Sequence, residues 1–346
     1  MRRNILLICH ISSSPIRRAR GVQLFFVASA ITLSMSWNAR HDGVVNFYIR
    51  RFFRIAPMFY LALAFFLWLR GFAANTYAPY GMGLRHALMT ATFTHGFMPD
   101  TITSIVPGSW SIADEMMFYA IFPLLIVAMN RVRFATAALA VGVATFVLAT
   151  VQVAVIMTIL RITDPTQRAL LGTFTDLWFL QQLPCFLFGM LVFKWVSEGR
   201  RISPRWSVAL VLLSVAGMIA SAFYPQMFLR LTLTMRYGLL FALFALGLMN
   251  WQPWLLVNPV IGWIGRVSYS GYLIHLTLIA VAPIPHANYP EAFLALTAAT
   301  LFFSSITYLC IEEPATRLGR RVIKAFSQAQ RPARSGSETA VTQTCS

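Results

Sequence analysis

Charged residues are scarce in this sequence of 346 residues, and acidic residues are especially few. Asp and Glu together number 11, charged residues make up 11% of the chain, and lysine occurs only as Lys194 and Lys324. A soluble domain carries about 25% charged residues, so this chain lacks the polar surface that a soluble fold requires. Hydrophobic residues instead make up 58% of the chain, which indicates an integral membrane protein.

Cysteine is also rare, and its placement argues against a disulfide framework or a zinc site. Cys185 and Cys310 fall within apolar runs, Cys9 lies in a short N-terminal run, and Cys345 lies near the C-terminus. We therefore expect no bound metal.

The shortage of acidic residues leaves a formal net charge of +17, carried almost entirely by arginine. These arginines lie between apolar runs rather than along one helix face. That distribution is typical of loops at an anionic membrane surface, so we expect the lipid bilayer as a partner and no nucleic acid.

Long apolar runs recur along the chain and predict an all-α, polytopic membrane helix bundle. A spanning helix needs about 20 mostly apolar residues. Such runs lie at residues 22–37, 53–69, 116–129, 134–156, 177–196, 206–223, 231–249, 268–283 and 292–311. The apolar run at residues 5–10 is too short for a signal peptide and lacks a cleavage site, so we interpret it as the end of a truncated first helix. The sequence thus predicts about ten transmembrane helices.

Arginine clusters in alternate loops orient these helices. The positive-inside rule places the clusters after residues 37, 129, 196 and 311 in the cytoplasm, although Arg17, Arg18 and Arg20 do not fit this scheme. The long loop at residues 70–109 is then external and could cover a site. We predict one transmembrane domain, residues 1–324, and a disordered cytoplasmic tail, residues 325–346.

Polar groups inside apolar runs are the first candidates for function, because burying them in a membrane is costly. Arg51 and Arg54 are spaced i and i+3, and Arg50 lies four residues before Arg54, so Arg54 shares a helix face with both. Guanidinium groups bind phosphates bidentately, which suits a phosphate-binding site. The alternative is an ordinary cytoplasmic membrane anchor.

A second group surrounds Glu115. Ser111 and Asp114 fit a capping box, which predicts a helix that begins here with Glu115 in its first turn. The helix dipole alone would explain a carboxylate at that position. The neighbouring Trp110 and Tyr119 favour a lined pocket instead.

Two histidines complete the candidates. Ser268, Tyr272 and His275 recur at i, i+4 and i+7 and form a polar stripe on an apolar helix. This histidine is either a ligand-binding group or a core residue satisfied by its hydroxyl neighbours. His10 lies beside Cys9 and, taken alone, indicates only a histidine at the membrane interface.

Six segments together resemble the membrane-bound acyltransferase-3 family, the bacterial O-acetylases of surface polysaccharides and their relatives. They occur in the family's order at residues 21–27 (GVQLFFV), 50–57 (RRFFRIAP), 110–115 (WSIADE), 183–189 (LPCFLFG), 268–275 (SYSGYLIH) and 311–314 (IEEP). Each segment is weak alone, and the six in order cover nearly the whole chain.

The resemblance implies transfer of an acyl group, most often acetyl, from acyl-CoA to a hydroxyl of a lipid-linked or secreted saccharide at the bacterial inner membrane. It implies a catalytic histidine shortly before the 21–27 segment, and His10 stands eleven residues before Gly21. Glu115 would orient that histidine or share its proton, and Arg51 and Arg54 would bind acetyl-CoA or another acyl-CoA. Trp110, Ser111, Ser268, Tyr272 and His275 would bind the acceptor.

Two other interpretations compete with the enzyme. A polytopic transporter also has many helices with buried polar groups, but no repeat relates the two halves of this sequence. A catalytically inactive acyltransferase relative is the other, because the family's first-helix arginine, about three turns before its histidine, has no counterpart in the sequence.

Overall fold

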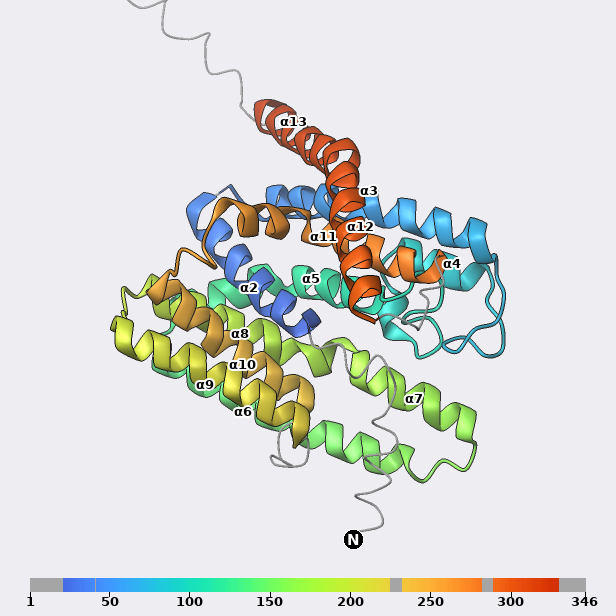
Figure 1. Ribbon diagram of the computed structural model, residues 1–346, viewed down its shortest axis with the longest axis horizontal. Helices are drawn as coiled ribbons and strands as arrows, with labels where there is room; N and C mark the ends of the chain where they lie inside the picture. The colour runs from blue at the N-terminus through green and yellow to red at the C-terminus, as the bar shows by residue number, and fades with distance from the viewer. Residues whose placement is uncertain (1–20, 41, 225–231, 282–288, 330–346) are drawn as a thin grey trace, which may run out of the picture. The chain divides into compact units, whose positions relative to one another are not determined.

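The structure is a computed structural model that describes residues 21–40, 42–224, 232–281 and 289–329 (Figure 1). Within these residues the regular structure is helical, and nine helices are long and apolar enough to cross a membrane. The predicted all-α membrane bundle is therefore confirmed. The chain divides into two compact units, Met1–His41 with Ala62–Arg266 and Asp42–Leu61 with Val267–Ser346.

The first unit contains most of the helices. They are α2 (Gly21–Arg40), α4 (Leu84–Ala91), α5 (Trp110–Arg131), α6 (Phe134–Ile159), α7 (Pro165–Leu177), α8 (Phe179–Ser197), α9 (Pro204–Phe223) and α10 (Leu233–Trp251). Helix α8 packs against α2, α5, α6 and α10, and α9 packs on α10 (Figure 1). The centre of the unit is thus α8, a strongly apolar helix buried along much of its length.

Small residues let the helices of this unit approach closely. A Cβ atom at Gly189 of α8 would lie 2.4 Å from the backbone oxygen of Val27 and 2.9 Å from Cβ of Ala30, both on α2. Gly247 of α10 meets the backbone oxygen of Ser207 on α9 in the same way, at 2.9 Å. Lipid tails are as apolar as leucine, so helices in a membrane associate through such close contacts.

A stack of three phenylalanines joins α2, α5 and α8. The ring of Phe186 lies between Phe26, at a centroid distance of 4.4 Å, and Phe118, at 4.1 Å. All three side chains are fully buried. Trp110 meets the Phe26 ring edge to face at 6.1 Å. This cluster fixes the start of α5, where Glu115 lies, against α2.

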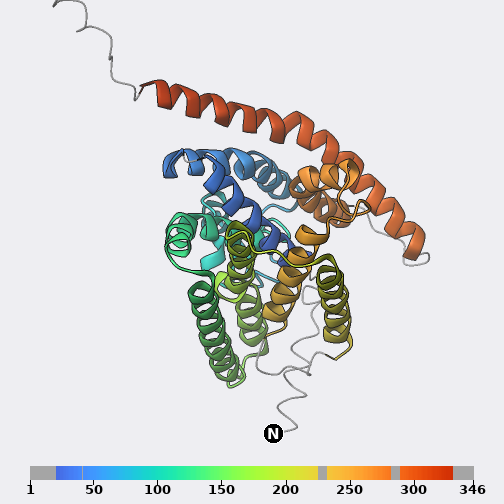
Figure 2. The same cartoon turned by 90° about the vertical axis from the view of Figure 1, so that its left-hand side faces the viewer.

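The second unit is built on the first part of α3 (Val44–Arg70) and the later part of α11 (Pro259–Val281). It also contains α12 (Tyr289–Thr307), the π-helical turn η3 (Tyr308–Glu312) and α13 (Glu313–Ala329). These last three elements follow one another as one long, bent helix (Figure 2). A π-helical turn is rare and often occurs at functional sites.

The sequence did not reveal three short elements. Helix α7 precedes the predicted run at residues 177–196; Asp164 caps it by accepting a hydrogen bond from the Thr166 backbone, and Pro165 occupies its first position. The loop predicted at residues 70–109 contains α4 and a 3₁₀ turn, His95–Phe97. All three elements are too short or too polar to stand out by hydropathy.

The close contact at Gly189 gives a test of the packing. Gly189→Ala should lower the free energy of unfolding by about 1–3 kcal/mol, because the added methyl group would collide with the α2 backbone. Thermal unfolding of the purified protein in detergent measures the effect. Gly142→Ala is the matched control, since nothing lies within 4 Å of a Cβ at that position of α6. Equal unfolding temperatures for the two variants would contradict the close α2–α8 contact.

Candidate functional site

Three arginines at the start of α3 each engage a different partner in the second unit. Arg50 forms a forked ion pair with Asp42, in which Nη2 lies 2.9 Å from Oδ1. The guanidinium of Arg51 lies over the Phe47 ring, 5.9 Å from its centroid. Arg54 forms an ion pair with Glu312 through Nη1. The predicted arginine face is therefore present, and its three cations are held in defined positions.

Glu312 is the most buried charged group in this arrangement. Its side chain is 0% exposed, whereas that of Arg54 is 28% exposed. Besides Arg54, the carboxylate accepts a hydrogen bond of 2.7 Å from Ser270 Oγ on α11. A buried carboxylate is tolerated when a cation and hydrogen-bond donors compensate its lost hydration. Glu312 thus joins α3, α11 and the π-helical turn η3.

Two further contacts tie α3 to α11 and to α13. The hydroxyl of Tyr269 on α11 donates a hydrogen bond of 2.7 Å to the backbone oxygen of Ile55, the residue that follows Arg54. Gly319 of α13 packs on Phe53, where a Cβ would lie 2.9 Å from Phe53 Cβ. Arg54 therefore stands between two positions at which α3 is tied to neighbouring helices.

The polar stripe predicted on α11 lies within the second unit as well. Ser268, Tyr272 and His275 are half-buried. The ring of His275 lies 5.5 Å from that of Tyr272, and its Nδ1 donates a hydrogen bond of 3.1 Å to the backbone oxygen of Gly271. A carbonyl only accepts, so this contact places the ring proton on Nδ1. Nε2 of a neutral His275 is then an acceptor.

Glu115 is buried in the first unit. Its Oε1 accepts a hydrogen bond of 2.8 Å from Ser29 Oγ on α2 and another from the Tyr119 hydroxyl, one turn along α5. The preceding residue, Asp114, is also fully buried, and neither of its carboxylate oxygens has a hydrogen-bond partner among the described residues. Two adjacent carboxyl groups thus lie inside a helical unit, where they are costly to bury.

The capping box predicted at Ser111 is wrong. Helix α5 begins at Trp110 with Ser109 as its N-cap, so Ser111 already lies inside the helix. Its Oγ donates to the backbone oxygen of Gly108, at 3.1 Å, instead of accepting from Asp114. Glu115 consequently lies beyond the first turn, and the helix dipole does not account for its burial.

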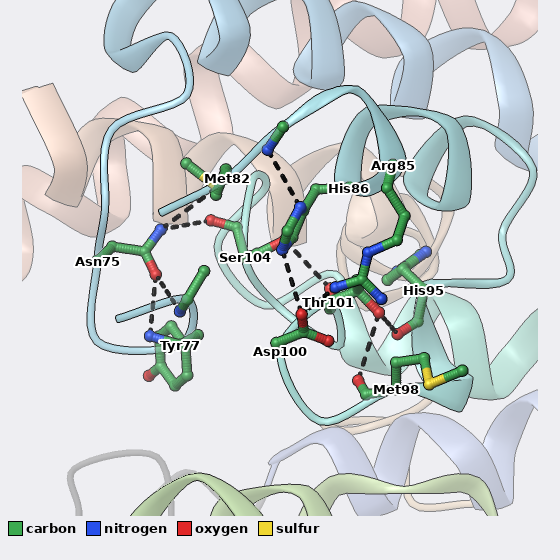
Figure 3. Close-up of polar contacts among 12 residues, drawn as sticks. Asn75, Tyr77, Met82, Arg85, His86, His95, Met98, Asp100, Thr101 and Ser104 are labelled. Carbon is green, nitrogen blue, oxygen red and sulfur yellow. Dashed lines mark hydrogen bonds and ion pairs between the residues drawn. The ribbon is translucent and has the colours of Figure 1, made fainter. Parts of the chain in front are cut away.

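The loop before α5 is tied together by its own polar groups (Figure 3). Asp100 forms an ion pair with Arg85, and its carboxylate lies 3.5 Å from Nε2 of His86. The backbone N–H of Gly83 donates to His86 Nδ1 at 3.1 Å, and Asn75 donates to the Ser104 backbone oxygen at 2.7 Å. These contacts make the loop a folded layer rather than a flexible connection.

His95 anchors this loop to the start of α5. Its ring is fully buried, and Nε2 donates a hydrogen bond of 3.1 Å to the backbone oxygen of Ser109, the N-cap of α5. Burial lowers the pKa of His95 from 6.5 to about 4, although hydrogen bonds to the backbone of Ser109 and Met89 oppose the shift. The ring is therefore neutral at physiological pH.

The candidate residues fall into two groups. Trp110, Ser111 and Glu115 belong to the first unit, whereas Arg51, Arg54, Ser268, Tyr272 and His275 belong to the second. His10 lies outside the described residues. Among the residues that the structure describes, no group of three or more His, Cys, Asp and Glu side chains could hold a metal ion.

Sequence reasoning missed Ser29, Ser270 and Glu312. Ser270 is two residues from Ser268, so it faces away from the predicted stripe on α11 and toward Glu312. Glu312 belongs to the segment IEEP, but nothing local in that segment pairs it with Arg54, 258 residues away. The available signal was a glutamate directly after the last apolar run, at residues 292–311.

Comparison with known families gives one match. The family model described as an acyltransferase domain (Acyl_transf_3) matches residues 17–309. His10 and Glu312 therefore lie just outside the matched range, and the other candidate residues lie within it. The chain matched no curated protein and no solved structure with which it was compared.

The burial of His95 predicts a pH-dependent stability. As pH falls from about 6.5 toward 4, the unfolded chain binds a proton at His95 that the folded chain does not, so the folded state loses stability. The loss is at most about 3 kcal/mol. His95→Gln should flatten this part of the profile, because the amide can still donate to Ser109 but does not titrate. Thermal unfolding across this pH range tests it, and an unchanged slope in the variant would assign the effect to another group.

Proposed function

Because the chain belongs to the acyltransferase-3 family, we propose that it transfers an acyl group from acyl-CoA to a sugar hydroxyl. The acyl group is most often acetyl, and the acceptor is a lipid-linked or secreted saccharide. The protein would act in the bacterial inner membrane as a multi-pass enzyme. Its nine long apolar helices, counted over the described residues, support the membrane location.

The observation that carries this proposal is the cationic face of α3. Coenzyme A bears several phosphates, and arginine forks bind phosphate oxygens bidentately. Arg50, Arg51 and Arg54 lie within two helical turns, and each is oriented by a partner in its own unit. A guanidinium carries five N–H donors, so Arg54 can pair with Glu312 through Nη1 and also contact a phosphate group. Arg51 and Arg54 are therefore our proposed donor-binding residues.

His10 is our proposed general base. The imidazole takes the proton from the acceptor hydroxyl as the hydroxyl oxygen attacks the thioester carbonyl. The carbon–sulfur bond of the thioester then breaks, an ester forms on the sugar, and the leaving CoA sulfur receives a proton. Glu115 orients the histidine or shares its proton; the hydrogen bonds from Ser29 and Tyr119 suit it for that role by fixing its carboxylate.

We propose that Trp110, Ser111, Ser268, Tyr272 and His275 bind the acceptor. Trp110 offers an aromatic face, and Ser111, Ser268 and Tyr272 carry hydroxyl groups suited to contacts with sugar hydroxyls. His275 contributes through Nε2, since its Nδ1 is engaged by Gly271. This histidine competes with His10 for the base role, so the two must be distinguished by experiment.

His10→Ala should lower acyl transfer by about 10²–10⁴-fold and leave acyl-CoA affinity unchanged, because a proton acceptor stabilises the transition state more than the ground state. Transfer is measured by mass spectrometry of polysaccharide from cells that express each variant at matched levels and are fed isotope-labelled acetate. Affinity is measured on the purified protein.

His275→Ala is the matched comparison and should weaken acceptor binding while leaving measurable transfer. Normal acetylation by His10→Ala would contradict the assignment of His10 and favour His275 as the general base. Absence of labelled acyl groups in the wild-type sample, with acyl-CoA still bound, would contradict the proposed saccharide acceptor.

A further inference from the structure

The helical stretch that ends the described chain is too long to be a single membrane span. The candidate span Pro290–Gln328 has 39 residues. At a rise of 1.5 Å per residue it measures about 58 Å, roughly twice the hydrocarbon thickness of about 30 Å. The stretch is bent (Figure 2), and the π-helical turn η3, followed closely by Pro314, interrupts its α-helical geometry. Helix α13 therefore extends beyond the hydrocarbon core.

Helix α13 has two chemically distinct faces. At 100° per residue, its four cations share one side: Arg317, Arg320, Arg321 and Lys324. Leu318, Val322 and Phe326 lie along the opposite side at intervals of four residues. The described part of α13 carries one acidic residue, Glu313, whose carboxylate lies 2.5 Å from Nη2 of Arg317. The helix thus combines a cationic face with an apolar strip.

The apolar strip is only partly covered within the unit. Leu318 is 50% exposed, Val322 38% and Phe326 43%. Helix α13 packs on the unit at Gly319, which meets Phe53 of α3. An exposed apolar strip bordered by arginines, immediately after a membrane span, matches the chemistry of the boundary between lipid headgroups and acyl chains.

We propose that α13 is an interfacial helix that binds the anionic phospholipids of the adjoining leaflet. Leu318, Val322 and Phe326 insert at the level of the first acyl carbons, and the flanking arginines and Lys324 contact lipid phosphates. Charge complementarity selects this partner, because the cations of α13 face a surface that carries negative charge in bacterial and eukaryotic cytoplasmic leaflets alike. The binding is independent of the acyl-transfer reaction proposed above.

The test uses the full-length protein reconstituted into vesicles of phosphatidylcholine alone or mixed with phosphatidylglycerol. An environment-sensitive fluorophore is attached at Ala325→Cys, beside the apolar strip, or at Ser327→Cys, on the polar side, after the natural cysteines are replaced by serine. Emission from position 325 should rise at least about twofold with phosphatidylglycerol and be quenched by brominated lipid, whereas emission from position 327 should change less.

The charge requirement is tested by combining Arg320→Gln, Arg321→Gln and Lys324→Gln, which should abolish the rise. The matched control combines Arg200→Gln, Arg201→Gln and Arg205→Gln, which removes equal charge from the α8–α9 loop and the first turn of α9 and should preserve the rise. High salt should weaken the lipid-dependent signal.

Three results would overturn the proposal. Emission that does not depend on lipid charge would exclude anionic phospholipid as the partner of α13. Emission that depends on protein density would indicate that the strip binds a second copy of the chain. Emission that requires added acyl-CoA would indicate that it binds the acyl donor.

Discussion

The ion pair between Arg54 and Glu312 is the constraint on which the second unit depends. Outside water, an unpaired charge costs several kcal/mol, so a buried carboxylate requires a cation and hydrogen-bond donors in fixed positions. Glu312 obtains them from Arg54 and from Ser270. Meeting this requirement brings α3, α11 and η3 together, and it leaves Arg54 partly exposed on the helix that also carries Arg51. The same contact therefore stabilises the unit and orients the group that we assign to the acyl donor.

The first unit also buries a carboxyl group. Glu115 receives hydrogen bonds from Ser29 and Tyr119, and the Phe26, Phe118 and Phe186 rings pack α2, α5 and α8 around it. Hydroxyl donors thus fix the Glu115 carboxyl group in the first unit, and a cation pairs with Glu312 in the second. The first arrangement suits the proposed role of Glu115 in proton transfer, and the second suits the proposed role of Arg54 in phosphate binding.

Apolar run length and arginine spacing predicted the spanning helices and the arginine face, because those features are local in the sequence. The partners of the buried carboxyl groups are not local. Glu312 lies far along the chain from Arg54, and Ser29 lies 86 residues before Glu115. The α11 stripe was predicted correctly as a helix face, but Ser270, on the other face, makes the contact with Glu312. The capping box failed because Ser109, two residues earlier, begins α5. The role of His10 stays a prediction.

The most direct test of this account is a double-mutant cycle on acyl-CoA affinity, measured with purified, folded wild type, Arg54→Gln, Glu312→Gln and the double variant. If Glu312 positions Arg54 for phosphate binding, each single change weakens binding and the double change adds little to Arg54→Gln. The cycle should then give a coupling free energy of about 1 kcal/mol or more. Additivity within about 0.5 kcal/mol, or wild-type affinity in Glu312→Gln, would contradict the claim that this ion pair builds the donor site.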